Sequence, residues 1–270
     1  MVDIIDFDDV LSFPDSLSSL NMRFVSDIVG KLDLRDNCNV WEIKKQMQDL
    51  HIDEMPIIDD YLKNNMNQKI AVWHASRLMN NDDIWTNGLV TDGGRESSGE
   101  KRINSLLEYI GLGEKEIKVI MNAVYYYWYR DKDQRTQSVH FFFDKNLVYN
   151  DDRINAFALN LGGEVLRWSL ESIGKELFKK YPYKRLWIEG RPSIIKFQCA
   201  LSNVHPLCRK KVLAEIIMFS LITKHYGLSY DFEFTGMTVN KIPPKDIISI
   251  ETIKDYVGIQ QKYSEYKDFY

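Results

Sequence analysis

The sequence predicts a protein of the α+β class, in which helices and strands are mixed without regular alternation. Three observations support this class. The run Lys69–Trp73 is short and apolar and contains β-branched residues, as a buried strand does. Segments with helical periodicity precede it. Four more strand-like segments follow it with helices between them, at residues 138–143, 192–201, 230–239 and 247–250.

Residues 1–68 are predicted to form a helical extension or cap, ahead of an α+β domain over residues 69–270. Helices are expected in the extension at residues 17–29, 39–50 and 55–62. The polar tract 63–68 that follows them is typical of a linker.

Helices are also expected beyond the first strand, at residues 81–86, 101–111, 114–130, 152–180 and 207–225. Asn80 or Asn81 is suited to cap the first of these, and Asn87-Gly88 is suited to end it. The stretch 91–100 is rich in Gly, Ser and charged residues, which is typical of a flexible loop. We expect this stretch to cover any site at the end of the strand.

The composition excludes several classes of protein. The formal net charge is −4, so no overall attraction to nucleic acid is expected. The cysteines, Cys38, Cys199 and Cys208, have no CxxC spacing and predict neither a disulfide framework nor a zinc site. The acidic start lacks the basic region of a signal peptide, and no apolar run is as long as a membrane span. A cytoplasmic protein is therefore expected.

The most informative polar cluster lies at the end of the strand expected over 69–78. His74, Ser76 and Arg77 follow one another there, and core packing alone does not require such residues. Their position favours ligand binding. His74 and Ser76 share one strand face, whereas Arg77 faces the other way unless the strand ends there. The structural alternative for His74 is a strand-end histidine that bonds only to backbone.

Two further segments carry candidate acids. Strand alternation places Asp231 and Glu233 on one face, for which a solvated polar face is the alternative. Glu164 follows the pair Gly162-Gly163 and opens a helical segment. A glutamate in a first helical turn also stabilises the helix dipole, which is the alternative role for this residue. The glycine pair is too short for a phosphate-binding P-loop.

Other polar and aromatic residues predict no site. His140, His205 and His225 lack metal-ligand spacing, so no metal centre is expected. No nucleophile motif surrounds a serine or a cysteine. The aromatic run 125–129 has the composition of a base-stacking surface, but on a helix its rings point in all directions, which favours packing.

Three segments, taken in order, carry a resemblance to a known family. They are Val72–Ser76 followed by Asn87-Gly88-Leu89, then Val139–Asp144 leading into Arg153–Ala158, then Phe232-Glu233-Phe234 ahead of Val239–Ile248. Their order resembles the ADP-ribosyltransferase superfamily, in particular the histidine-type branch that includes poly-ADP-ribose polymerases and diphtheria-like toxins. The resemblance covers about residues 69–253.

This resemblance implies split antiparallel sheets with NAD bound in the cleft between them. The NAD contacts that it implies are His74, Ser76, Arg77, Gly88 and, against the nicotinamide ring, either Phe157 or Tyr149. His74 would hydrogen-bond a ribose. Glu233 would stabilise the oxocarbenium-like transition state as nicotinamide leaves. Asp231 and Glu164 compete with Glu233 for the role of the essential acid.

The resulting hypothesis is a toxin-like, NAD-consuming ADP-ribosyltransferase or NAD glycohydrolase. The sequence specifies neither the acceptor, which is a protein, a nucleic acid, a small molecule or water, nor the oligomeric state. The alternative is a non-catalytic α+β binding module of the same fold. A third reading, a nucleic-acid enzyme, rests on a run of basic residues offset by nearby acids, namely Lys175, Lys179, Lys180, Lys184, Arg185 and Arg191.

Overall fold

The computed structural model describes residues 4–9, 24–25, 28–32, 39–53, 55–90, 93–130, 138–180, 182–230, 235–257 and 259. The chain divides into two compact units. The first comprises Met1–Val72 and Gln198–Gly236, and the second comprises Trp73–Phe197 and Met237–Tyr270. The first segment of this unit ends at Val72, whereas the boundary is expected at residue 68. The second segment, Gln198–Gly236, falls within the domain expected over residues 69–270.

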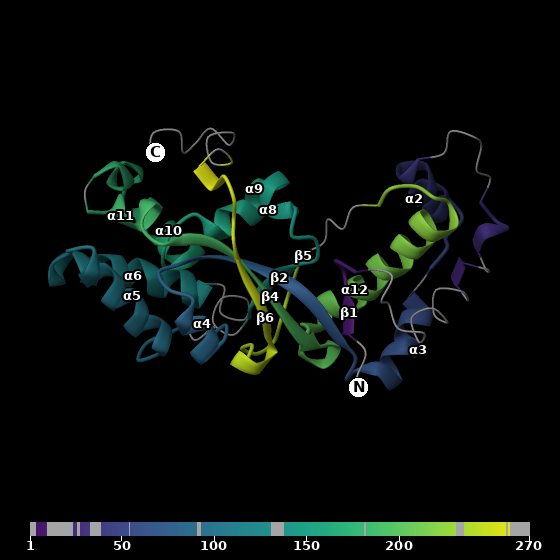
Figure 1. The fold of residues 1–270 in the computed structure, drawn as a ribbon, viewed down its shortest axis with the longest axis horizontal. Coiled ribbons are helices and arrows are strands. Elements are labelled where there is room, and N and C mark those ends of the chain that lie inside the picture. The colour runs from purple at the N-terminus through teal and green to yellow at the C-terminus, as the bar shows by residue number, and fades with distance from the viewer. Residues whose placement is uncertain are drawn as a thin grey trace. The chain divides into compact units, whose positions relative to one another are not determined.

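The protein belongs to the α+β class, and its described strands form one sheet with the order β5-β3-β2-β4-β6. The strands are β1 (Ile4–Asp6), β2 (Lys69–Leu78), β3 (His140–Phe142), β4 (Arg191–Ala200), β5 (Thr235–Met237) and β6 (Ile247–Thr252). The pairs β2–β3 and β4–β6 are antiparallel, whereas β1 pairs with β2 in parallel. Figure 1 shows β2, β4 and β6 side by side. A single sheet replaces the split pair that the resemblance implies.

The described part of the first unit consists mainly of helices, with strands at β1 and at the ends of β2, β4 and β5. Its longer helices are α2 (Val40–Asp49), α3 (Met55–Asn65) and α12 (Pro206–Phe219), and α12 continues as the π-helix η5 (Ser220–His225). Asn39 and Glu42 form a capping box at the start of α2, the helix that the apolar periodicity over 39–50 predicts. α3 runs on to Asn65, so the prediction of a linker from residue 63 is wrong at its start. The strand β1 also corrects the prediction of a wholly helical extension, and the helix expected over 17–29 lies largely outside the described residues.

The second unit packs several helices around an apolar core. They are α4 (Asp82–Asn87), α5 (Ser98–Tyr109), α6 (Glu114–Arg130), α8 (Leu147–Asn150), α9 (Asp152–Asn155), α10 (Gly163–Ile173) and α11 (Arg185–Ile188), with the 3-10 turns η2 (Ala156–Ala158), η3 (Lys175–Lys179) and η6 (Pro244–Asp246). A further 3-10 turn, η4 (Leu201–Asn203), belongs to the first unit. α6 packs against α10 and α5, as Figure 1 shows. Val124, Leu107, Leu166 and Trp187 are fully buried in this core.

Two local differences from the sequence prediction bear on the site. α5 begins at Ser98 because the Ser97 hydroxyl accepts a hydrogen bond from the Glu100 amide, so the predicted loop over 91–100 ends earlier than expected. The helical segment predicted over 152–180 is broken, with Gly162 in the left-handed conformation just ahead of α10. In the part of the chain that the structure describes, no helix is long and apolar enough to cross a membrane.

Candidate functional site

The second unit contains a cavity of about 750 Å³, formed by segments that are far apart in the chain. Its wall comes from the end of β2, the α4 segment, the start of α5, β3, η2 and the start of α10. Small-molecule and cofactor sites have volumes of about 300–1,000 Å³, so this cavity has the size of such a site. The predicted site residues that line it are His74, Ser76, Arg77, Gly88, Phe157 and Glu164.

His74 lies on β2 with its ring held in one orientation. Its Nδ1 is 2.8 Å from the carbonyl oxygen of His140, and because a carbonyl only accepts, Nδ1 carries the proton. Burial lowers the pKa of His74 from its ordinary value of 6.5, and the hydrogen bond to His140 opposes this only in part. The imidazole is therefore neutral near pH 7, and Nε2 is left as an acceptor. This nitrogen can accept a hydrogen bond from a ligand hydroxyl.

Ser76 lies two residues further along the same face of β2. Strand alternation buries Trp73, Ala75 and Arg77 on one side and leaves His74 and Ser76 half-buried on the other, as the sequence predicts. The Ser76 hydroxyl has no hydrogen-bond partner among the residues that the structure describes. It is available to the same ligand as Nε2 of His74.

Phe157 supplies an aromatic face to the cavity. Its ring stacks on that of His140, with the ring centroids 6.0 Å apart and the planes at 27°. His140 thus acts twice, since its carbonyl orients His74 and its ring supports Phe157. The spacing of the histidines predicts neither role for His140. Its place in the segment Val139–Asp144, which carries the family resemblance, is the signal that could have found it.

Arg77 lines the cavity, but its guanidinium is used to hold the backbone together. The side chain is 6% exposed. Nε donates to the carbonyl of Ala158 at 3.3 Å, and Nη1 donates to the carbonyls of Glu189 at 3.0 Å and Gly190 at 3.5 Å. The guanidinium also lies 5.5 Å from the centre of the Tyr256 ring. These contacts support a structural role for Arg77 rather than the predicted contact with NAD.

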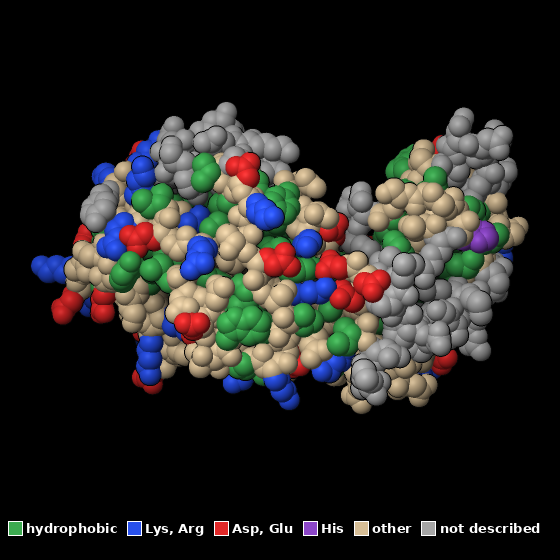
Figure 2. Space-filling model, in the orientation of Figure 1, with side chains coloured by type: hydrophobic (Ala, Val, Ile, Leu, Met, Phe, Trp, Pro, Cys, Tyr) green, Lys and Arg blue, Asp and Glu red, His purple; other side chains and the backbone are tan. Residues whose placement is uncertain are grey.

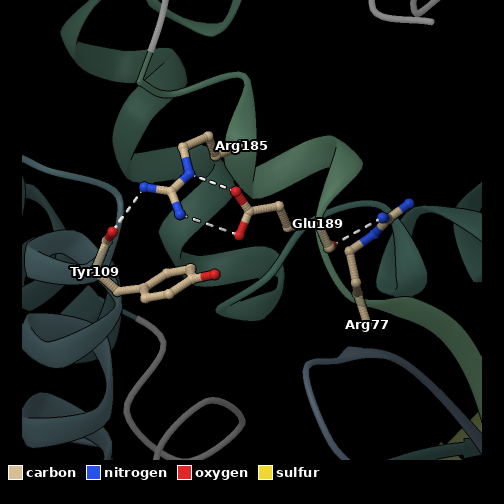
Figure 3. A network of polar contacts seen from close by, with 4 residues as sticks. All are labelled: Arg77, Tyr109, Arg185 and Glu189. Carbon is tan, nitrogen blue, oxygen red and sulfur yellow. Dashed lines mark hydrogen bonds and ion pairs between the residues drawn. The ribbon is translucent and has the colours of Figure 1, made fainter.

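A surface network fixes the backbone to which Arg77 bonds (Figure 3). The carboxylate of Glu189 accepts hydrogen bonds from the guanidinium of Arg185, and Arg185 also donates to the Tyr109 carbonyl at 2.8 Å. The hydrogen bonds from Arg185 and then from Tyr109 lower the pKa of Glu189. The hydrogen bond between the Tyr109 side chain and Glu189 is also the main cause of the raised pKa of Tyr109. Arg185, one of the basic residues considered for nucleic-acid binding, is therefore committed within the protein.

Gly88 fits a close approach between two backbones. Its φ is +73°, and a Cβ atom there would lie 2.0 Å from the carbonyl oxygen of Ile242. The next residue, Leu89, forms an antiparallel bridge with Ile242, with N···O distances of 2.9 and 3.0 Å. Gly88 is therefore required by packing as well as by its place at the cavity wall.

Glu164 stands in the first turn of α10, half-buried at the cavity. Gly162 and Gly163 precede it with φ values of +84° and +73°, and Asn160 donates from its side chain to the carbonyls of Leu161 and Gly163. A Cβ atom on Gly163 would meet nothing within 4 Å. The loop therefore brings bare backbone and one carboxylate to the cavity.

Charged residues that the sequence analysis missed lie at the start of α5 and on α4. Lys101 and Arg102 line the cavity, and Arg102 forms an ion pair of 3.4 Å with Asp83. Both partners of this pair are substantially exposed, so it contributes little to stability. On the face of the second unit that Figure 2 shows, basic and acidic side chains are interspersed.

The described part of the predicted loop, residues 93–97, is anchored beside the cavity. A Cβ atom on Gly93 would lie 2.8 Å from Nε1 of Trp128, and the Arg95 guanidinium lies 5.2 Å from the centre of the Tyr125 ring. The Tyr125 hydroxyl donates to the Glu100 carboxylate. Burial, and then this hydrogen bond, raise the pKa of Tyr125 to about 12.

Not every predicted residue reaches the cavity. Tyr149 packs against the core from α8 and does not line it, so of the two aromatic candidates only Phe157 does. Glu233 and Asp231 lie outside the described residues, which omit 231–234 of the strand predicted over 230–239, whereas its later part contains β5. In the described part of the chain, no group of three or more His, Cys, Asp or Glu is placed to hold a metal ion.

Comparisons of the chain with protein-family models, with curated proteins and with solved structures found no match. The function is therefore inferred from the residues that line the cavity.

Proposed function

We propose that the protein cleaves the bond between nicotinamide and ribose in NAD, as an ADP-ribosyltransferase or an NAD glycohydrolase. The observation that supports this most is the convergence on one cavity of His74, Ser76, Gly88, Phe157 and Glu164. These residues come from the segments that carry the family resemblance and from the Gly-Gly-Glu turn.

Each of these side chains has a binding role that its geometry suits. The neutral imidazole of His74 would accept a hydrogen bond from a ribose hydroxyl through Nε2, and Ser76 would bond to the same sugar. Phe157 would stack on the nicotinamide ring, held by His140 behind it. Orienting both ends of the scissile bond lowers the entropic part of the barrier.

The reaction breaks the C–N glycosidic bond, and its electron pair leaves with nicotinamide, which becomes neutral. Positive charge develops on the ribose, so a carboxylate nearby stabilises the transition state more than the ground state. Glu233 is the proposed carboxylate, with Glu164, which lines the cavity, and Asp231 as alternatives. The acceptor then adds to the ribose carbon and gives up its proton.

The test is nicotinamide release from NAD, measured by chromatography, together with the shift in melting temperature that NAD produces. If NAD binds the folded protein, a concentration 100 times its Kd stabilises the fold by about 2.7 kcal/mol. E233Q is expected to abolish nicotinamide release while the protein still folds and binds NAD. Wild-type turnover in E233Q would contradict that assignment, and the same measurement on E164Q would then test the alternative acid.

A matched pair of variants tests the role of His74. In H74N the amide nitrogen can replace Nδ1 as the donor to His140, but no acceptor stands at the position of Nε2. H74Q places an amide near Nε2 instead. H74N is expected to weaken NAD binding roughly tenfold with little loss of stability. Unchanged affinity in H74N would show that Nε2 does not contact the ligand.

The binding-module alternative gives a different result in the same assays. NAD would raise the melting temperature without release of nicotinamide, and E233Q would behave as the wild type. If NAD neither binds nor reacts at millimolar concentration, the proposed function is wrong.

A further inference from the structure

The helix α6 exposes one face that combines aromatic and basic side chains. Tyr126 is 61% exposed, Tyr129 is 50% exposed and Val119 is 54% exposed, although large apolar side chains are usually covered. The opposite face of the helix buries Ile120, Val124 and their neighbours in the core. The exposed rings are therefore not needed for packing, contrary to the expectation for the aromatic run.

Basic side chains share this face. With about 100° of rotation per residue, Lys115 projects within about 40° of both Tyr126 and Tyr129. Lys118 projects about 20° from Tyr129, and Arg130 projects about 40° from Tyr126, so the face spans about 120°. All three are exposed. Lys115 and Lys118 form no ion pair with any residue that the structure describes. The guanidinium of Arg130 lies 5.9 Å from the centre of the Tyr126 ring, so it stiffens the aromatic surface as well as charging it.

The acidic residues of α6 lie at the edges of this face, and Glu114 projects about 40° from Lys118 and about 60° from Tyr129. Glu114 and Glu116 lie in the first turn, each about 100° away from the direction of Lys115. Glu116 also accepts a hydrogen bond of 3.1 Å from the Gly113 amide. The face thus carries three cations with the Glu114 carboxylate at its edge, in a chain whose net charge is −4.

We propose that the face formed by Lys115, Lys118, Val119, Tyr126, Tyr129 and Arg130 binds single-stranded nucleic acid. Exposed aromatic rings stack on bases, and lysine and arginine neutralise the phosphates between them, which is how sequence-independent single-strand surfaces work. From Lys115 to Arg130 the helix rises about 22 Å, which is long enough for several nucleotides. An acidic peptide would use the cations but would not need two exposed tyrosines.

The test is fluorescence anisotropy of a labelled oligothymidine, titrated with the full-length protein in the absence of NAD. Binding is expected to weaken with salt, and log K should fall with log salt at a slope of about −2 if three cations contact phosphates. The variant Y126A/Y129A is expected to lose on the order of tenfold or more in affinity. K115E/K118E is expected to lose affinity and to flatten the salt dependence.

Matched variants elsewhere on the second unit serve as controls. W85A removes another exposed aromatic residue, and K175E/K180E makes the same change of charge within the alternative basic run. Both should bind like the wild type, and melting temperatures should show that all variants fold. The proposal is wrong if the oligonucleotide does not bind at low salt, if K175E/K180E loses as much affinity as K115E/K118E, or if polyglutamate competes as well as single-stranded DNA. Nicotinamide release is measured separately, so neither result decides the other.

Discussion

Gly88 and Gly163 provide a test of the backbone geometry at the cavity, because both have a φ of +73° but different surroundings. At Gly163 an alanine with this positive φ costs about 1–2 kcal/mol. At Gly88 ψ is −161°, a combination that essentially only glycine adopts, so an alanine there costs about 1–3 kcal/mol. At Gly163 the added methyl group meets nothing within 4 Å, so strain is the whole effect. The expected loss of unfolding free energy in G163A is therefore about 1–2 kcal/mol.

In G88A the methyl group would lie 2.0 Å from the carbonyl oxygen of Ile242, so the two backbones must separate. Their separation breaks the two hydrogen bonds between Leu89 and Ile242, each of which contributes about 1 kcal/mol. Added to the strain, the loss becomes about 3–5 kcal/mol. Since Gly88 and Leu89 line the cavity, G88A should also weaken the binding of any ligand there.

Urea denaturation of the wild type and the two variants measures these losses. The comparison that matters is the extra loss in G88A relative to G163A, which should be about 2 kcal/mol or more because the two hydrogen bonds are lost in addition to the strain. Equal destabilisation by the two substitutions would refute the close approach of Gly88 to Ile242. A loss in G163A as large as that expected for G88A would show that the space beside Gly163 is filled.

Three further predictions follow from the same site. R77M should destabilise the fold by about 2–3 kcal/mol in urea denaturation, because it leaves the buried carbonyl of Ala158 and the partly buried carbonyl of Glu189 without this donor. A loss below about 1 kcal/mol would contradict the role given to Arg77. Because the pKa of His74 is lowered, the unfolded chain binds that proton more readily, so stability present above pH 6.5 should be lost as the pH falls below it. H74N should lack this part of the pH dependence, and identical curves for the two proteins would refute it. Y125F should remove the tyrosine that ionises near pH 12 from a spectrophotometric titration and should increase proteolysis at residues 93–97, and unchanged cleavage would show that Tyr125 does not anchor the loop.

The parts of the fold that could be predicted are those in which the periodicity of apolar and polar side chains shows which face of an element is buried. The apolar run of β2 and the two-residue period after it predict both the strand and the shared face of His74 and Ser76. The long helices α5 and α6 follow from their apolar stripes. In each case the pattern is local, and it records which side of the element meets the core.

Pairings between distant segments could not be predicted in the same way. The short strand β1 carries little pattern of its own, and it is a strand because it pairs in parallel with β2. The exposure of Tyr126 and Tyr129 depends on which face of α6 meets α10, and the run of five aromatics does not indicate that face. Whether the strands form one sheet or two likewise depends on long-range partners.

At the site, likewise, the side chains that face the cavity could be predicted, whereas the backbone groups that position them could not. Carbonyl groups hold its main pieces: that of His140 orients His74, those of Ala158 and Glu189 hold Arg77, and that of Ile242 sets the turn at Gly88. Every residue type has a carbonyl, so no residue pattern identifies these anchors. Sequence reasoning therefore finds the side chains that face a ligand more readily than the groups that position them. For the same reason, the polar cluster at the end of β2 predicts that Arg77 contacts a ligand, although its partners are carbonyl groups far along the chain.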